Sequence, residues 1–123
     1  MSTLKTGKVK TTTIADELDT ESTDVTNVIN GTAKAWVNLN GTGTVAIRRA
    51  FNVSSITDSA TGIYQVNFTN EMVDANYATF VNCDFDGFFW TTAGVQTTSK
   101  TNINVFNGSA YFDRSYVYVS VFS

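Results

Sequence analysis

The chain has 123 residues, a net charge of −3, no histidine, no proline and a single cysteine. This length suits one domain with at most a terminal arm. Without histidine, and with one thiol, the sequence excludes a Cys/His zinc site, a Ser-His-Asp triad, a Cys-His dyad and an internal disulfide. Its acidic balance, with a pI near 4.6, argues against nucleic-acid binding. No apolar run approaches the ~20 residues of a membrane span, and the N-terminus lacks the apolar stretch of a secretory signal, so we expect no membrane insertion.

Three residue types dominate the composition: threonine, valine and asparagine, with 20, 14 and 12 residues. Threonine, valine and aromatic side chains suit a pleated, half-buried sheet surface. The Asn-Gly pairs that begin at Asn30, Asn40 and Asn107 are strong hairpin signals. Strand-like segments recur at intervals of about ten residues, a spacing typical of sandwiches and barrels. The sequence therefore predicts an all-β fold, an antiparallel β-sandwich of about eight strands with a jelly-roll-like order.

Residues 1–31 differ from the rest and are predicted to form an extended N-terminal arm. Lysines come first, acidic residues follow, and no aromatic residue occurs before Trp36, so this segment brings little to a core. One strand is expected over residues 9–14, and the Thr13 hydroxyl is also placed to cap a single helical turn after it. The apolar side chains expected to anchor the arm to a neighbouring subunit or a larger assembly are Val9, Ile14 and Leu18.

Residues 32–123 carry the strand pattern and are predicted to form the β-sandwich module. Apolar and polar residues alternate through much of this region, which is typical of strands with one buried face. A polar turn is expected at residues 57–62, and residues 84–94 are expected to form an aromatic-rich hairpin or loop. The predicted strands are residues 33–39, 44–51, 52–56, 64–69, 77–83, 95–106 and 116–122.

An aromatic cluster within this module is a candidate site. Three roles fit it: a core strand, a subunit interface, or a loop that presents aromatic platforms to an external ligand such as a sugar. The sequence leaves the choice among these roles open. The cluster consists of Phe85, Phe88, Phe89 and Trp90.

Trp36 and Arg48 are further candidates for a subunit-interface or ligand-facing surface. Trp36 alternates with small apolar residues, and its ring is expected to be buried, within the sheet stack or between subunits. Arg48 and Arg49 are an adjacent basic pair whose side chains point to opposite sides of a strand. One of them is expected to pair with an acid across a subunit boundary. Cys83 is expected to be a small buried hydrophobic residue.

The acidic residues give no convincing catalytic pair. Asp84 and Asp86 would share one face of a strand, but nothing in the sequence indicates a lined cleft or raised pKa values around them. Other aspartates lie in turn-like contexts, where Asp usually bonds its own backbone. We therefore expect no catalytic residues, no cofactor and no metal ion, and no enzymatic activity.

Three stretches of the module share a specific combination of residues. The first is AKAWVNLNGTGTVAIR at 33–48. The second is FNVSSITD at 51–58, followed by Gly62, Tyr64 and VNFT at 66–69. The third combines Met72, DANY at 74–77 and YVYVSVF at 116–122. Together they resemble a β-rich module of tailed bacteriophages, found at the C-terminal end of tail fibres and in related virion proteins. The chain departs from that pattern at Val73, where proline is common, and at Ser123, where glycine is frequent.

The resemblance implies a non-enzymatic virion structural protein, a homotrimeric tail-fibre or tail-tip module that acts in assembly and host-surface attachment. Two alternatives stay open: a capsid decoration (cement) protein and a carbohydrate-binding, lectin-like module. The implied partners are further copies of the chain, other virion proteins contacted through the N-terminal arm, and a host-surface glycan; nucleic acid is not expected. The implied location is the exterior of the phage particle, on tail or capsid, after synthesis in the bacterial cytoplasm.

Overall fold

The computed structural model describes residues 7–84 and 90–123, and the chain divides into two compact units, Met1–Thr32 and Ala33–Ser123. Strands dominate the described residues, which contain one helix. The two units are described separately below.

The smaller unit contains a short antiparallel hairpin followed by a helix. β1 (Thr13–Ala15) pairs with β2 (Ser22–Asp24), and α1 (Val25–Gly31) follows β2 directly. Asp16 holds the turn between the strands, because its carboxylate accepts hydrogen bonds from the backbone N–H groups of Thr20 and Glu21 at 2.7 and 3.1 Å. The Thr20 hydroxyl also donates to this carboxylate, and together these bonds lower the pKa of Asp16.

Three predictions for this unit are wrong. The strand expected over residues 9–14 begins only at Thr13. The helical turn capped by Thr13 does not form, because Thr13 belongs to β1 and the Asp16 carboxylate serves the hairpin turn instead. Asn30 and Gly31, which predict a hairpin turn, are the last two residues of α1; glycine is also common where a helix ends.

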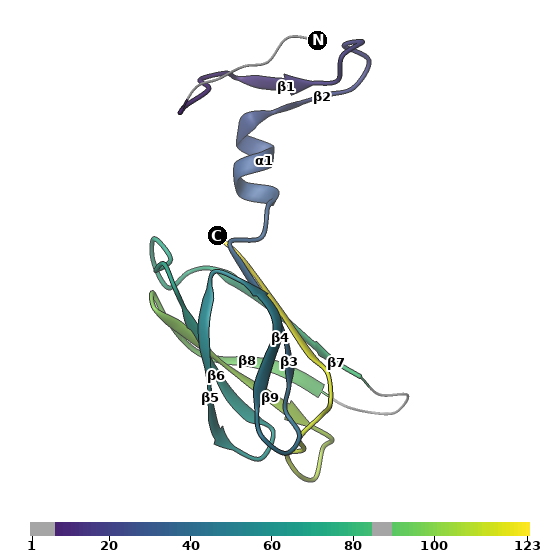
Figure 1. Cartoon of the computed structure of the whole chain (residues 1–123), viewed down its shortest axis with the longest axis vertical. Helices are drawn as coiled ribbons and strands as arrows, with labels where there is room; N and C mark the ends of the chain where they lie inside the picture. The colour runs from purple at the N-terminus through teal and green to yellow at the C-terminus, as the bar shows by residue number, and fades with distance from the viewer. Residues whose placement is uncertain (1–6, 85–89) are drawn as a thin grey trace. The chain divides into compact units, whose positions relative to one another are not determined.

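The larger unit is a sandwich of two antiparallel four-stranded sheets (Figure 1). The first sheet has the order β4-β3-β10-β7 and the second the order β5-β6-β9-β8. The all-β, antiparallel character predicted from the sequence is confirmed for the residues that the structure describes. The bounds are β3 (Ala35–Asn40), β4 (Ala46–Phe51), β5 (Val53–Ala60), β6 (Ile63–Phe68), β7 (Ala78–Cys83), β8 (Trp90–Thr97), β9 (Lys100–Phe106) and β10 (Val117–Phe122).

Two strand boundaries in this unit correct the sequence prediction. β5 continues to Ala60, so the turn predicted at 57–62 shrinks to Thr61 and Gly62. Residues 95–106 form two strands rather than one, because β8 and β9 are joined by a tight turn at Thr98 and Ser99. That second turn contains no Gly, Pro or Asn, the residues that most often mark a turn in a sequence.

The jelly-roll-like strand order is also wrong. Consecutive strands form hairpins within one sheet, namely β3–β4, β5–β6 and β8–β9, whereas a jelly roll places most consecutive strands in opposite sheets. Short connections favour pairing between neighbours in the chain. The connection of β5 to β6, for example, consists of Thr61 and Gly62 alone.

The core lies between the two sheets of the larger unit and follows strict alternation along the strands. Inward residues of β3 and β10 meet inward residues of β6 and β9, and each fully buried aliphatic side chain contributes ~1.5–3 kcal/mol. In the smaller unit, by contrast, no residue from 7 to 32 is buried. The buried core residues on these four strands are Ala35, Val37, Leu39, Val117, Val119, Val121, Tyr64, Val66, Phe68, Ile103 and Val105.

The connection from β9 to β10 crosses from the second sheet to the first. It is held in place by hydrogen bonds with Tyr64 of β6. The Tyr64 hydroxyl lies 2.7 Å from Asp113 Oδ1 and 3.2 Å from the carbonyl oxygen of Gly41. The backbone N–H of Gly62 also donates to Asp113 Oδ1, at 2.7 Å. A backbone bond from Gly41 N–H to Arg114 O, at 2.9 Å, joins the same connection to the end of β3.

Candidate functional site

One outer surface of the sandwich is rich in aromatic side chains. The strands of the first sheet alternate, so residues between the core positions point away from the second sheet. Among these outward residues, Phe80 is 61% exposed, Phe51 53%, Tyr118 42% and Tyr116 39%. We call this surface the aromatic face and define it by Trp36, Phe51, Phe80, Tyr116, Tyr118 and Phe122.

The strand register places several of these residues in one row across the whole sheet. Phe51 of β4 is paired with Trp36 of β3, Trp36 with Ser120 of β10, and Ser120 with Phe80 of β7. Phe80 also contacts Phe122 edge to face, with ring centroids 5.8 Å apart. This row therefore crosses all four strands on the side away from the core, with aromatic rings on β4, β3 and β7 and the Ser120 hydroxyl on β10.

The next row of outward residues, two positions further along each strand, is mainly polar. Arg49 is paired with Asn38, Asn38 with Tyr118, and Tyr118 with Asn82. Asn38 Oδ1 is buried, and within the described part of the chain it accepts no hydrogen bond. A buried acceptor without a donor costs ~1–3 kcal/mol, and Asn102 Oδ1 on the outer side of the second sheet is in the same state.

Arg48 lies at the edge of the aromatic face because of a β-bulge. Asn38 is paired with Arg49 and Leu39 with Ile47, so Arg48 is the extra residue; bulges commonly redirect a side chain in this way. The Arg48 guanidinium lies over the Tyr116 ring, 4.1 Å from its centroid, and donates to Ser115 O at 2.9 Å.

The Tyr116 ring beneath Arg48 continues the aromatic surface along β10. It stacks with Tyr118 at a centroid distance of 6.2 Å. A cation over an aromatic ring is an attractive arrangement, so Arg48 and the two tyrosines form one ordered end of the aromatic face.

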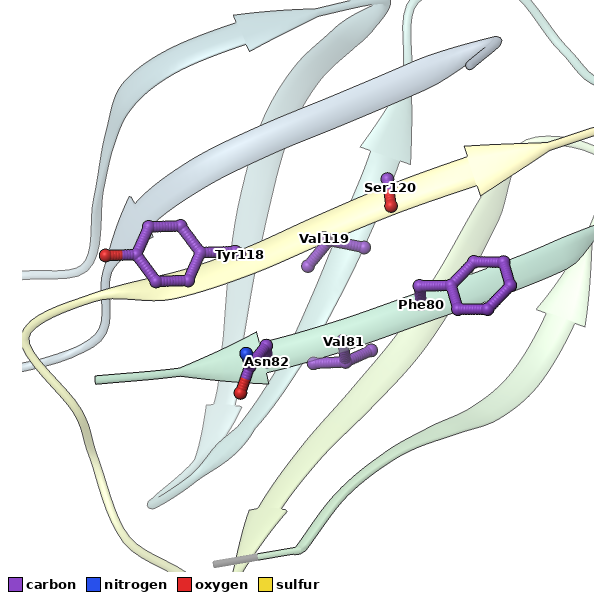
Figure 2. Close-up of a pocket in the computed structure, with 6 residues that line it drawn as sticks. All are labelled: Phe80, Val81, Asn82, Tyr118, Val119 and Ser120. Carbon is purple, nitrogen blue, oxygen red and sulfur yellow. The ribbon is translucent and has the colours of Figure 1, made fainter. Parts of the chain in front are cut away.

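A shallow depression of about 360 Å³ lies on β7 and β10 of this sheet. Phe80 and Tyr118 stand at its two ends, and Ser120 and Asn82 lie between them (Figure 2). It therefore combines aromatic rings with a hydroxyl and an amide.

The outer surface of the second sheet is rich in amides and hydroxyls, and at one end of it Phe106 of β9 packs against Tyr111 with ring centroids 5.1 Å apart. Its amides and hydroxyls bond to each other: Gln65 donates to Asn67 at 2.8 Å, and Asn67 donates to the Thr57 hydroxyl at 3.1 Å. Asn104 donates to the Thr92 hydroxyl at 3.3 Å. We call this surface the polar face; its residues are Ser55, Thr57, Gln65, Asn67, Thr92, Asn102 and Asn104.

The structure brings two of the candidates from the sequence, Trp36 and Arg48, onto the aromatic face. Burial of Trp36 in the sheet stack is wrong: its side chain is half-buried on the outer side, because Ala35, Val37 and Leu39 occupy the core side of β3. Burial of Trp36 between subunits, and an acidic partner for Arg48 or Arg49 in a neighbouring subunit, stay predictions.

The remaining candidates from the sequence belong to other parts of the chain. Phe85, Phe88 and Phe89 lie outside the described residues, and Trp90 begins β8, where its backbone is paired with Phe106. In the smaller unit the three arm candidates are exposed, Val9 by 62%, Ile14 by 48% and Leu18 by 79%.

Sequence reasoning missed five members of the aromatic face: Phe51, Phe80, Tyr116, Tyr118 and Phe122. The signal that identifies two of them was present, because Phe80 alternates with Val81 and Phe122 with Val121.

The described residues offer little for covalent or metal chemistry. They contain no group of three or more His, Cys, Asp or Glu side chains that could hold a metal ion. Burial raises the pKa of the half-buried Cys83 thiol, which disfavours a reactive thiolate. Asp84 is engaged with Arg114, which donates to its backbone oxygen and lies 3.7 Å from its carboxylate. Across the same described residues, no helix is both long and apolar enough to cross a membrane.

The larger unit is therefore an antiparallel β-sandwich with one outer surface that is aromatic and one that is mainly polar. Comparisons with protein-family models, with curated proteins and with solved structures give no match.

Proposed function

We propose that this protein is a non-enzymatic structural and adhesive module that assembles as a homotrimer through its aromatic face. The observation that carries the proposal is the contrast between the outer surfaces: one presents Phe51 and Phe80 more than half exposed, the other a self-bonded amide and hydroxyl array. Contiguous exposed apolar patches usually mark interaction sites, and aromatic residues are enriched among the residues that dominate interface energies.

Burial of this face favours association. A fully exposed aromatic side chain gains ~1.5–3 kcal/mol when buried, so side chains that are about half exposed gain about half of that, and their sum opposes the ~4–15 kcal/mol cost of lost rotational and translational freedom.

The assignment to a phage particle rests on the resemblance to the tail-fibre module. On that basis the trimer forms part of a tail fibre or tail tip on the virion exterior and contributes to assembly and host-surface attachment, with the N-terminal arm contacting other virion proteins. The same surfaces would serve a capsid decoration protein. Labelling the protein in intact particles and locating the label by electron microscopy separates these positions.

The oligomeric state tests the proposal directly. Light scattering should give about 40 kDa, three times the 13.4 kDa of one chain. Phe80→Asp places a charge in the aromatic row and should shift the mass to that of the monomer. Thr92→Asp is the matched control on the polar face, since its carboxylate can accept the bond that Asn104 donates, and it should keep the trimer. A wild-type monomer at micromolar concentration contradicts the proposal.

The depression between Phe80 and Tyr118 favours a second candidate function, carbohydrate binding. Aromatic rings give sugar rings an apolar platform, and Asn82 and Ser120 offer the few oriented polar groups that small-ligand sites use. The two functions exclude each other at this face, because an interface between subunits would cover the depression. A glycan array with wild type and Phe80→Asp distinguishes them: a monomer that binds glycan through Phe80 supports the lectin, and a trimer without such binding supports the interface.

A further inference from the structure

Helix α1 in the smaller unit carries an apolar stripe, and its seven residues include no charged side chain. Val25, Val28 and Ile29 lie at spacings of three and four residues, which places them on one side of the helix. Val28 is 39% and Ile29 56% exposed, and none of the residues from 7 to 32 is buried. The helix therefore exposes an apolar surface in a unit that has no core of its own within the described residues.

The helix is also too short and too weak to persist alone. It spans seven residues, and its Asp24 N-cap makes no side-chain capping bond. Its sequence, VTNVING, consists of residues with modest or poor helix propensity. Isolated helices below ~12–15 residues are marginal in water even when rich in alanine. Packing against a further surface would therefore stabilise α1.

We propose that α1 packs against α1 of the two other copies as a short parallel three-helix bundle; this inference rests on the homotrimer of the proposed function. Val25 and Val28 are three residues apart, the spacing of the a and d positions of one heptad. β-Branched side chains at both a and d favour three or four strands over two. The seven residues of the helix contain no charged side chain, so the Asp24 N-cap is the charged residue that adjoins the proposed bundle.

The short covalent link between α1 and the sandwich favours α1 of other copies as the partner of its apolar stripe. Only Thr32, Ala33 and Lys34 separate the end of α1 from the start of β3, the strand that carries Trp36 of the aromatic face. Once three modules have assembled, a tether this short holds three helices at millimolar effective concentration. Weak contacts between valines then suffice, because the association has become intramolecular.

Cysteine cross-linking in the full chain tests the bundle. In a Cys83→Ala background, Val28→Cys places a thiol on the proposed bundle axis, and Asn30→Cys places one on the opposite side of the same helix. Mild oxidation should give at least about fivefold more covalent dimer for Val28→Cys than for Asn30→Cys, because the effective concentration is high only at the axis. Since a disulfide joins two chains, the third chain of each trimer should remain unlinked.

The mass of each variant separates the two proposals. A trimeric mass with linkage selective for Val28→Cys supports the bundle. A trimeric mass with equal linkage at both positions, or at neither, overturns the bundle and leaves the trimer of modules intact. A monomeric mass for the unoxidised protein overturns the proposed trimer, and the bundle with it.

Discussion

The Tyr64 hydroxyl meets the Asp113 carboxylate at 2.7 Å at the end of the sandwich where the chain crosses between sheets. Tyr64 is fully buried in the core from β6, whereas Asp113 belongs to the long connection between β9 and β10. Burial, and after it the hydrogen bond and charge of Asp113, raise the pKa of Tyr64. A single side-chain pair thus ties the irregular connection to the hydrophobic core.

Replacement of this hydroxyl should destabilise the module without changing its fold. Tyr64→Phe leaves the Asp113 carboxylate with the hydrogen bond from the Gly62 N–H. Hydrogen bonds to charged groups contribute ~1.5–3 kcal/mol, and we expect a loss of that size in the free energy of unfolding by urea. Tyr118→Phe, on the exposed aromatic face, is the control and should leave the monomer's unfolding midpoint unchanged. An unchanged midpoint for Tyr64→Phe would show that the bond contributes nothing.

Alkaline pH should weaken the fold through the same residue. Because the pKa of Tyr64 is higher in the folded state than its usual value of about 10, the folded state holds its proton after the unfolded state has lost it. The stabilisation is fully present below pH 10 and is lost as the pH rises above it. The free energy of unfolding should fall by about 1.4 kcal/mol per pH unit above that point. Urea titrations from pH 9 upward should show this slope in wild type and a shallower one in Tyr64→Phe.

Asn52 should prove the most sensitive position of the corner between β4 and β5. Its φ is +53°, its side-chain amide donates to Lys34 O and Asn70 O, and its Oδ1 accepts from Asn70 N–H at 2.7 Å. Asn52→Ala loses the bonds and adds ~1–2 kcal/mol of left-handed strain, while Asn52→Gly loses the bonds alone. Urea midpoints should therefore fall in the order wild type, glycine, alanine. If the urea midpoints of Asn52→Ala and Asn52→Gly are equal, the left-handed backbone conformation does not affect stability at this corner.

Alternation along the strands explains why much of the module was predictable. Val117, Val119 and Val121 predict one inward face of β10, and the structure buries all three. Alternation separates two faces of a strand but does not say which one meets the core. On β3 the small side chains point inward because the opposing sheet supplies Tyr64 and Phe68, and that partner is distant in the sequence.

The parts that sequence reasoning missed depend on weak local signals or on distant partners. The turn at Thr98 and Ser99 joins two strands whose flanking residues are all polar, so the hydrophobic pattern gives no boundary there. Helix α1 has a composition that favours strands and turns. The aromatic face spans four strands from both halves of the module, and its continuity follows only once the register is known.

Trp36→Ala should weaken the trimer much more than the monomer. Its ring is half-buried on the outer side of β3, so in the monomer we expect a loss of about 1 kcal/mol, between that of an exposed and that of a core position. In the trimer the rest of the ring is buried in each of three subunits, and the sum of three contributions of about 1 kcal/mol should raise the dissociation midpoint by about tenfold. Sedimentation equilibrium over a dilution series measures this shift. Val95→Ala, at a 70% exposed position of β8, is the control, and an equal effect of both variants would remove Trp36 from the interface.

Charges on the hairpin of the smaller unit should abolish incorporation into particles while leaving the module intact. Ile14 and Leu18 are 48% and 79% exposed, and all buried core residues of the described chain lie in Ala33–Ser123. Ile14→Asp combined with Leu18→Asp therefore removes apolar anchors without touching the core or α1. We expect an unchanged trimeric mass and an unchanged urea midpoint, together with loss of the protein from gradient-purified particles on immunoblots.

The control for the hairpin variant adds the same two charges at polar positions nearby. Thr12 and Ser22 are both exposed, so Thr12→Asp combined with Ser22→Asp should incorporate as wild type does. Because exposed charges contribute little to folding and fade with salt, a difference between the two double variants reports contact with a partner and not instability. Normal incorporation of the Ile14 and Leu18 variant would show that these side chains do not anchor the arm. A lowered urea midpoint in that variant would instead assign the arm a role in holding the module together.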